Sequence, residues 1–302
     1  MKVVIFGGTG FIGTSLARHL KKQGFDPTLI ARHKPGPQNE FEFFQWDAVH
    51  QGKWVKALEG ALAIVNLAGK SVDCRKTPDN CDLILRSRID STLAIGKALE
   101  SMSQKPNVWV QMSTAHIYGD PPTQWCSENS TTGYGLAPHV GRAWEKSLLE
   151  SLPPGMREVR LRTSFVMGKH GGALRTLFRI AKCGLGGTIG TGNQGMSWIH
   201  ENDLNALIHE AIVNNSYAGV YVASAPTPVS NKEFMKALRQ KLLLPIGLPA
   251  PGLLIRMAAK WLLNTDSELA LYGRYVTSQR LQDNSFRFQF PTLSLALNDL
   301  LD

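Results

Sequence analysis

The sequence has no long apolar run. No stretch approaches the ~18 consecutive apolar residues of a membrane-spanning helix, because glycine or lysine interrupts each run early. A secretory signal is absent as well, since the predicted strand Lys2–Phe6 starts directly after Met1 and leads into a glycine loop. Secretion would need an apolar segment of ~7–15 residues before a small-residue cleavage site. We therefore expect a cytoplasmic protein with no membrane partner.

Cysteine is also scarce. The four cysteines form no Cys-x-x-Cys pair, and no histidine stands beside them at the spacing of a zinc site: Cys74, Cys81, Cys126 and Cys183. This pattern predicts free thiols in a reducing compartment and no metal centre. The sequence also has no carboxylate dyad and no Ser-His-Asp order, which argues against a hydrolase.

Acidic residues are outnumbered by basic ones. The chain has 302 residues with 33 Lys+Arg and 24 Asp+Glu, which gives a net charge of +9. The basic residues are spread over separate segments, and no basic stripe alternates with aromatic residues. Diffuse positive charge of this kind is typical of a solvated surface rather than of a nucleic-acid interface. We expect no nucleic-acid partner, and a site for an anionic cofactor is the simpler use of the charge.

Short apolar runs alternate with longer helical patterns in the first half of the chain. The expected strands are Lys2–Phe6, Thr28–Ile30, a run ending at Gln45–Asp47, Ala63–Ala68, Val108–Met112 and Glu158–Arg162. Helices are expected between them, over Ile12–Gln23, Leu83–Met102 and Arg142–Leu152. This alternation predicts an α/β fold with a Rossmann-type doubly wound parallel sheet over residues 1–165. Ligands of such sheets bind at the carboxyl ends of the strands.

The pattern changes after about residue 166, where Gly- and Pro-rich stretches interrupt short helices. A smaller α+β substrate lobe is predicted over residues 166–302, partly interleaved with the first lobe. We expect Gly168–Gly172, Gly184–Gln194 and Trp198 to form a lid over a small ligand. An irregular connector is the alternative for these glycines. Asp203 is expected to cap the helix that follows.

The strongest motif is a glycine loop that follows the first predicted strand. Gly7, Gly10 and Gly13 stand at Gly-x-x-Gly-x-x-Gly spacing and open the first predicted helix. The first glycine permits a tight turn, the second lets the backbone approach a pyrophosphate, and the third lets the helix pack on the strand. Free backbone N–H groups and the helix dipole then supply an anion site. The sequence therefore predicts a dinucleotide site.

The end of the second predicted strand indicates which dinucleotide is bound. An acidic residue there would grip the ribose 2′-hydroxyl of NAD, but the strand runs into Ala31, Arg32, His33 and Lys34. A planar guanidinium can stack on adenine and pair with a 2′-phosphate. The first lobe is thus expected to bind NADP(H), with a surface arginine of no consequence as the alternative.

A series of motifs, in the order in which they occur, gives the chain a specific family resemblance. They are Phe6–Gly13, Val65–Gly69, Ser87–Ile89, Ser113–Ala115 with Tyr118–Gly119, Arg142–Glu145, Gly171–Ala173, Gly184–Gly187, Ser197–His200 with Asp203–Leu204, Ala225–Pro226, Asn231–Phe234 and Phe286–Leu301. The chain resembles an atypical extended short-chain dehydrogenase/reductase. It is most similar to the NAD-dependent epimerase/dehydratase-like "epimerase family protein" branch, which has a small C-terminal domain. The resemblance covers essentially the whole chain.

The resemblance implies further cofactor contacts. Asp47 would meet the adenine edge, Leu67–Gly69 would run along the ribose, and Thr163 would lie near the nicotinamide. Arg88 would be a further contact, with a helix-surface ion pair as the alternative. The full expected set is Gly7, Thr9, Gly10, Phe11, Ile12, Gly13, Ala31, Arg32, Asp47, Leu67, Ala68, Gly69, Arg88 and Thr163.

The expected acid/base residues of that family are missing. Its members use a Tyr-x-x-x-Lys pair with a Ser or Thr, but no tyrosine in this chain has a lysine four residues later. Aligning Glu145 with the family's helix glutamate puts Ala137 and Gly141 at the two positions. Thr114 matches the Ser/Thr position and is the main catalytic candidate, with Tyr134 as a possible substitute. His116 lies nearby and has a suitable ordinary pKa.

Two functions of different class therefore stay open. The first is an NADP(H)-dependent oxidoreductase or epimerase-like enzyme acting on a small carbonyl or sugar-like substrate, with Thr114 orienting the reacting oxygen. The second is a non-catalytic NADP(H)-binding sensor or partner-binding protein, which the missing Tyr and Lys favour. A homodimer through the helix Leu83–Met102 is also expected from the resemblance.

Overall fold

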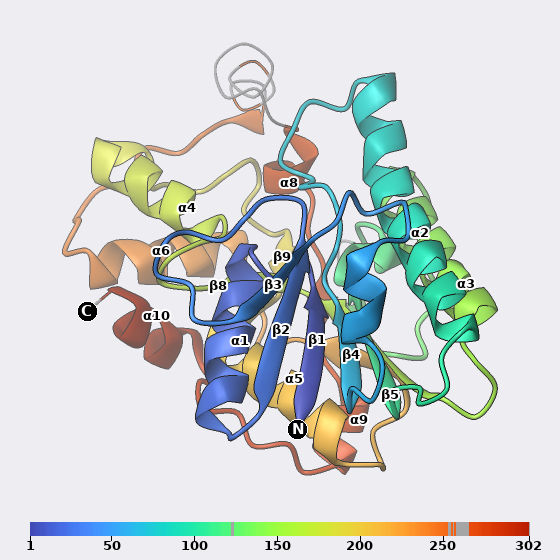
Figure 1. Cartoon of the computed structure of the whole chain (residues 1–302). Coiled ribbons are helices and arrows are strands. Elements are labelled where there is room, and N and C mark those ends of the chain that lie inside the picture. Colours follow the sequence, from blue (N-terminus) through green and yellow to red (C-terminus); the bar gives the residue numbers. More distant parts are fainter. Residues whose placement is uncertain (122–123, 253–254, 256, 258–265, 302) are drawn as a thin grey trace.

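A parallel sheet of seven strands organises the structure, a computed structural model that describes residues 1–121, 124–252, 255, 257 and 266–301. The strand order is β11-β7-β5-β4-β1-β2-β3, and every neighbouring pair is parallel (Figure 1). The strands are β1 (Lys2–Phe6), β2 (Asp26–Ala31), β3 (Glu42–Gln45), β4 (Ala63–Asn66), β5 (Val108–Thr114), β7 (Arg157–Thr163) and β11 (Gly219–Ala223).

The predicted fold class is confirmed. Successive strands run outward from β1 through β2 to β3, and the chain then crosses back to β4 on the other side, which is the doubly wound arrangement. Six strands lie where apolar runs predicted them. The seventh, β11, comes from beyond residue 165 and pairs with β7 along Gly219–Ala223. The two lobes interleave through this strand, while a boundary near residue 165 stays a prediction.

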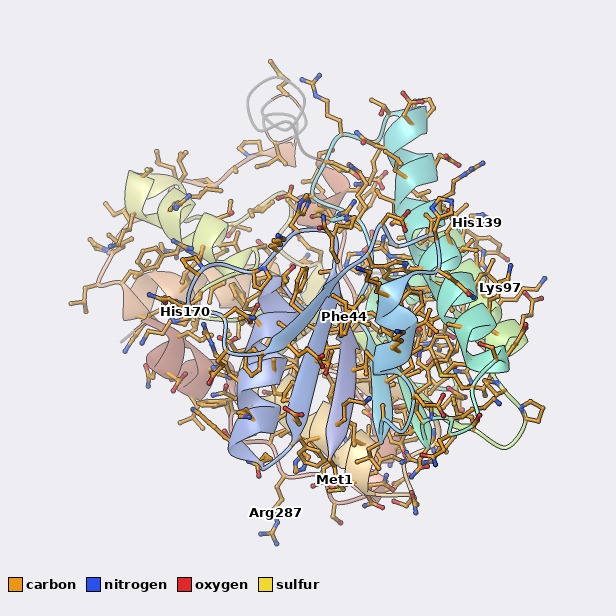
Figure 2. The ribbon with its side chains drawn as sticks, in the orientation of Figure 1. Met1, Phe44, Lys97, His139, His170 and Arg287 are labelled. Carbon is orange, nitrogen blue, oxygen red and sulfur yellow. The ribbon has the colours of Figure 1, made fainter. Side chains whose placement is uncertain are left out.

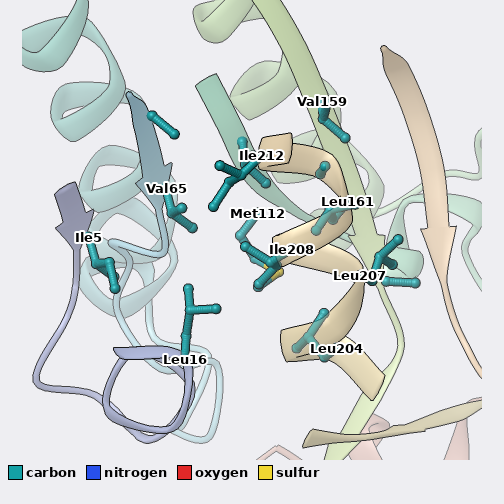
Figure 3. Close-up of a cluster of buried hydrophobic side chains, with 14 of the residues drawn as sticks. Ile5, Leu16, Val65, Met112, Val159, Leu161, Leu204, Leu207, Ile208 and Ile212 are labelled. Carbon is teal, nitrogen blue, oxygen red and sulfur yellow. The ribbon is translucent and has the colours of Figure 1, made fainter. Parts of the chain in front are cut away.

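Helices cover both faces of the sheet. On one face α1 (Phe11–Lys22) packs against α5 (Glu201–Val213), and on the other α2 (Pro78–Glu100) packs along α3 (Leu136–Ser151) (Figure 1). Because strand side chains alternate between faces, Ile5 belongs to the core under α1 and α5, shown in Figure 3. Its neighbour Phe6 belongs to the core under α2 and α3.

The C-terminal part builds a third core beside the sheet. Trp198, Phe234 and Leu297 are fully or almost fully buried there, between short helices and short strand pairs. The helices are α4 (Leu174–Ile180), α6 (Asn231–Lys241), α8 (Glu268–Leu271), α9 (Gln279–Asp283) and α10 (Leu293–Leu301). The strand pairs are β8 (Phe165–Met167) with β10 (Trp198–His200), β9 (Gly195–Met196) with β12 (Val229–Ser230), and β6 (Trp125–Cys126) with β13 (Tyr275–Val276).

The start of α5 corrects one expectation from the sequence. His200, not Asp203, is the N-cap, and its side chain accepts the Asn202 amide. Asp203 is fully buried one turn further on. Its carboxylate accepts the backbone amides of Gln289 at 2.7 Å and Phe290 at 3.1 Å. The carboxylate therefore fastens the C-terminal segment to the start of α5 instead of capping the helix.

Two sequence expectations concern thiols and membranes. All four cysteines carry free thiols. Within the described ranges, every helix is too short or too polar to cross a bilayer.

Two histidines face each other where α1 packs on α5. The rings of His19 and His209 lie 5.9 Å apart, and Phe25 packs edge-on against His209 at 5.4 Å. Burial, and then the charge of His209, lowers the pKa of His19. Burial also lowers the pKa of His209. Both rings are therefore held in the neutral form in the folded state.

Acidification should weaken this packing. The unfolded chain binds more protons than the folded chain once the pH falls toward the ordinary histidine pKa, so the free energy of unfolding should decrease from about pH 7.5 to about pH 5.5. Urea unfolding at the two pH values measures the change. His19→Leu/His209→Leu should lose part of the pH dependence, whereas the exposed His33→Gln should keep it. Equal pH dependence in the wild type, the double variant and His33→Gln would contradict the role given to His19 and His209.

Candidate active site

The candidate site residues gather at the carboxyl edge of the sheet. The strands are parallel, so the segments after β1, β2, β4, β5 and β7 all leave at that edge (Figure 1). The glycine loop follows β1, Ala31 is buried at the end of β2, and Leu67–Gly69 follow β4. Thr114 and Thr163 end β5 and β7 and are register partners. The topology thus brings residues from five strands to one edge.

Close backbone contacts require glycine in the loop after β1. Gly7 has a φ of 74°, and its N–H donates to the Ile30 carbonyl at 2.8 Å. A Cβ atom at Gly7 would lie 2.9 Å from the Leu67 carbonyl carbon. A Cβ at Gly13 would lie 2.6 Å from both the Gly7 oxygen and the Gly8 Cα. The loop can therefore lie against the Leu67 backbone, and α1 can start directly on the loop.

The first turn of α1 presents backbone donors to the site. Gly10 is the N-cap in an extended conformation, and no described side chain caps the turn or adds an acidic group to it. Thr9 precedes this cap, and Phe11, Ile12 and Gly13 form the turn itself. Uncapped amides at the positive end of a helix dipole fit a pyrophosphate.

The glycine-rich loop at residues 168–172 lies on the ring of Phe11. A Cβ at Gly168 would be 2.3 Å from the Phe11 ring, and one at Gly171 would be 2.4 Å from it. The Lys169 amide also donates to the Glu201 carboxylate at 2.9 Å, which ties the loop to the start of α5. Glycine is needed here because any side chain would push the loop off the aromatic ring. The predicted lid segment therefore borders the start of α1.

A cavity of about 460 Å³ lies beyond the end of β2. The exposed Arg32 lines it together with Asp47 and His50. Two residues that the sequence analysis missed form its buried wall: Trp46 and Trp54 both donate their indole N–H to the His50 carbonyl, at 2.7 and 3.1 Å. The signal that could have found them is an aromatic pair flanking an acidic turn just after the third strand.

Asp47 is held in place by the turn that follows it. The His50 ring, 2.6 Å from one carboxylate oxygen, and then the His50 and Val49 amides lower the pKa of Asp47 to about 2. The carboxylate is more than half exposed at the cavity rim. Its charge is therefore fixed at the rim of the cavity that Arg32 also lines.

A buried amide network fixes the segment after β4. The Asn66 side chain accepts the Ala68 amide at 3.1 Å and donates to the Gln111 side chain at 3.1 Å. The Trp109 indole donates to the same Gln111 oxygen at 3.0 Å. Asn66 and Gln111 are fully buried, so breaking either bond would leave a polar group without water. This network positions Leu67–Gly69, and its members were not predicted as site residues.

Arg88 reaches this segment from α2. It donates to the carbonyls of Lys70 at 3.1 Å and Ile84 at 2.9 Å, and its guanidinium lies 5.0 Å from the Trp144 ring centroid. A Cβ at Gly69 would lie 3.2 Å from its central carbon. Burial lowers the pKa of Arg88 to about 10, which leaves it charged at neutral pH. No carboxylate pairs with it among the described residues, so the alternative of a surface ion pair is not supported.

The predicted catalytic residues lie in different environments. The Thr114 hydroxyl accepts the His116 amide at 3.1 Å, which leaves its proton free to donate. The buried Thr163 hydroxyl donates to the Leu161 carbonyl at 3.1 Å. Tyr134 is 95% exposed, so a catalytic role for it stays a prediction. Burial, together with Arg274 and Lys76, lowers the pKa of His116 well below its usual value, which makes it a neutral acceptor at pH 7.

Close packing explains why α3 has no lysine at the expected position. Gly141 faces the short helix after β5, and a Cβ there would lie 3.1 Å from the Ile117 side chain. Behind it, Glu145 accepts the Ser113 hydroxyl at 2.7 Å and two Arg162 nitrogens at 2.9 Å. An added side chain at residue 141 would press on Ile117, and the sequence has neither the tyrosine nor the lysine at residues 137 and 141.

Comparisons with known proteins agree with this geometry. Residues 3–223 match the NAD dependent epimerase/dehydratase family, and residues 250–300 match a domain of unknown function, DUF1731. Epimerase family protein SDR39U1 homolog, chloroplastic, from Arabidopsis thaliana is 31% identical over 306 residues, covering 100% of this chain and 87% of the relative. Epimerase family protein YfhF from Bacillus subtilis is 30% identical over 312 residues, covering 100% and 98%.

A solved crystal structure has the same fold as this chain. Human epimerase family protein SDR39U1 (isoform2), crystallised with NADPH, superposes with a TM-score of 0.88 at 28% identity. The superposition covers 99% of this chain and 99% of the human one.

The contact between Gly13 and the glycine loop should be sensitive to a single methyl group. Gly13→Ala would press its Cβ into backbone atoms that cannot rotate away, so we expect the free energy of unfolding to fall by ~1–3 kcal/mol. Urea unfolding measures the change. Gly36→Ala is the matched control because nothing lies within 4 Å of its added Cβ, and it should change stability by less than about 0.5 kcal/mol. A loss of similar size in both variants would refute the packing argument.

Proposed function

The chain belongs to the NAD dependent epimerase/dehydratase family, and from this membership we propose that it binds NADP(H) at the carboxyl edge of the sheet. The observation that carries the choice of cofactor is Arg32, an exposed guanidinium at the end of β2 that lines the cavity of about 460 Å³. No acidic residue stands at that strand end to select NAD. The NADPH in the human relative's crystal structure supports the same choice.

Different residues of the site bind different parts of the dinucleotide. The first turn of α1 receives the pyrophosphate, Arg32 receives the 2′-phosphate, and Leu67–Gly69 lie along the ribose. Arg88 adds a positive charge beside Gly69. When bound, NADP(H) supplies or accepts a hydride at its nicotinamide. Thr163, at the end of β7, lies on the side of the site proposed for that ring.

The proposed activity is oxidoreduction or epimerisation of a small carbonyl or sugar-like substrate. Thr114 orients the reacting oxygen, because its hydroxyl proton is free while its lone pair holds the His116 amide. The loop at residues 168–172 packs on the Phe11 ring and excludes water from that side of the site. Because residues 137 and 141 of α3 are Ala and Gly instead of Tyr and Lys, proton transfer falls to another group near the end of β5.

A non-catalytic NADP(H)-binding sensor or partner-binding protein is the second candidate. It is favoured by Ala137 and Gly141, which stand where the usual Tyr and Lys of the acid/base pair would be. Hydride-transfer assays on panels of carbonyls and nucleotide sugars separate the two functions. Silence across the panels with cofactor bound would favour the sensor.

The location of the chain in the cell and its assembly into a homodimer are also proposals. The Arabidopsis relative is named as chloroplastic, so a cytoplasmic location for this chain stays a proposal. A homodimer is supported by exposed leucines on two packed helices: Leu83 and Leu93 on α2 and Leu149 on α3.

The cofactor proposal predicts a selective thermal shift. At ~100-fold above its dissociation constant, NADPH should add about 2.7 kcal/mol of stability and raise Tm by several degrees, and NADH should add less. Arg32→Glu should weaken NADPH binding about tenfold or more and reduce the preference over NADH. Arg287→Glu makes the same charge change at an exposed residue outside the proposed site, labelled at the lower edge of the molecule in Figure 2, and should leave the preference intact. Unchanged preference in Arg32→Glu would refute the role of Arg32.

The role of Thr114 predicts a loss of turnover without a loss of cofactor. For any substrate found in the panels, Thr114→Ala should lower kcat by ~100-fold, because the hydrogen bond to the reacting oxygen is removed. The NADPH thermal shift should stay as in the wild type. Thr114→Ser keeps the hydroxyl and should restore most of the rate. Equal rates for the Ala and Ser variants would exclude the hydroxyl from the reaction.

A further inference from the structure

One buried arginine near the site forms no ion pair in the described ranges, although the charge of Asp120 acts on it. Arg274 is only 8% exposed, and its Nε donates to the Gly119 carbonyl at 2.7 Å. Its two terminal nitrogens have no hydrogen-bond partner in the described ranges, and no carboxylate forms an ion pair with it. A buried guanidinium left in this state is costly. Burial lowers the pKa of Arg274 to about 10, so the group is still charged at neutral pH.

The backbone holds Arg274 in place from two sides. Its amide donates to the Gly195 carbonyl at 2.9 Å, and its carbonyl accepts the Ser197 hydroxyl at 2.8 Å. A Cβ at Gly195 would lie 2.4 Å from the Arg274 carbonyl carbon, so Gly195 has to be a glycine. The neighbouring Gly273 amide donates to the Asp120 carboxylate at 2.7 Å. Asp120 thus holds the backbone beside Arg274 and forms no ion pair with its guanidinium.

Two more basic groups stand around Arg274. The His116 ring makes no hydrogen bond within the described chain, and the charges of Arg274 and Lys76 both act on it. Lys76 donates to the Val72 carbonyl at 2.6 Å and forms an ion pair with Asp266 at 3.5 Å. Lys76 is therefore already paired, and Arg274 is the cation near His116 that forms no ion pair in the described ranges.

This cluster borders the proposed reaction centre. His116 follows Thr114 by two residues, and its amide donates to the Thr114 hydroxyl at 3.1 Å. The Gly119 carbonyl that accepts from Arg274 closes the same short helix, because the Gly119 amide donates to the His116 carbonyl at 3.0 Å. Thr114 and the carbonyl that accepts from Arg274 thus stand at the two ends of one short helix, Ala115–Tyr118.

We infer that Arg274 and His116 form a subsite for an anionic oxygen group of the substrate, a carboxylate or a phosphoryl group. The inference rests on the proposed function, because Thr114 holds the reacting oxygen of the same substrate. The free terminal nitrogens of Arg274 bind two oxygens of the anion in the planar fork that suits both groups. His116 lies beside the bound anion as a further donor once it is protonated.

A second buried arginine, Arg162, has a structural role and differs from Arg274 in its partners. Arg162 is also 8% exposed, but two of its nitrogens contact Glu145 at 2.9 Å and a third lies 3.0 Å from the Tyr118 hydroxyl. Its charge is neutralised within the fold. Arg274 has the same burial and only one carbonyl acceptor, which is the state expected of a group that is completed by a ligand.

His116 can report whether the subsite is filled. An anion on Arg274 offsets the positive charge that lowers the pKa of His116, so binding should raise that pKa. The other charged groups near the cluster are Lys76, its partner Asp266, and Asp120 beside Arg274. None of them is removed by the variants below.

The experiment follows the His116 ring by NMR during pH titrations of the protein saturated with NADP⁺. Inorganic phosphate and oxalate are added separately at constant ionic strength, and His116→Gln assigns the signal. At least one anion should raise the pKa of His116 in the wild type, and the effective one identifies the phosphoryl or carboxylate class. Arg274→Gln should weaken the binding of that anion about tenfold or more. The exposed Arg287→Gln should respond like the wild type.

Several outcomes would overturn the inference. A His116 pKa that ignores both anions would do so, and so would an equal response in the wild type and Arg274→Gln. If Arg274→Gln fails to fold, Arg274→Lys keeps the charge without the fork and should bind the anion more weakly than the wild type. The NADPH thermal shift is read separately, so loss of cofactor binding and loss of the His116 response are distinguishable failures.

Discussion

The site depends on one close contact, between the start of α1 and the loop after β1. Gly13 lies against the Gly7 oxygen and the Gly8 Cα, at distances that no side chain allows. The contact sets the direction in which the first-turn amides point. It also places Phe11 beneath the loop at residues 168–172, and Gly7 against the Leu67 carbonyl. Two segments that are distant in sequence, residues 168–172 and Leu67, are thus positioned relative to one short turn of backbone.

Features that follow from local pattern could be predicted from the sequence, and features that need distant contacts could not. Alternating apolar runs predicted six strands and the doubly wound sheet, and the spacing of three glycines predicted the loop. Asp203 was misassigned as a cap because its true partners, Gln289 and Phe290, are more than 80 residues away. The unpaired Arg274 becomes visible only once remote segments are placed together, because its acceptor Gly119 is more than 150 residues away.

The missing acid/base pair has a structural basis. Gly141 lets α3 lie directly on Ile117, and that approach brings Glu145 within reach of Ser113 and Arg162. A side chain at residue 141 would press on the Ile117 side chain beside this buried network. The place of the usual lysine is thus a close helix contact next to the neutralised pair of Glu145 and Arg162. Any proton transfer must come from groups on the other side of Thr114, where His116 and Arg274 lie.

The arginines in and around the site differ in whether a carboxylate pairs with them. Arg162 is buried and neutralised by Glu145, so it contributes no field to the site. Arg32, Arg88 and Arg274 form no ion pair with a carboxylate in the described ranges. Arg32 follows β2, Arg88 reaches the segment after β4 from α2, and Arg274 contacts the segment after β5. Arg88 and Arg274 are largely desolvated, and unpaired charges at such positions attract anions far more strongly than charges on an open surface. The uneven pairing therefore directs part of a net charge of +9 toward one edge of the sheet, where a dinucleotide and an anionic substrate would supply the missing partners.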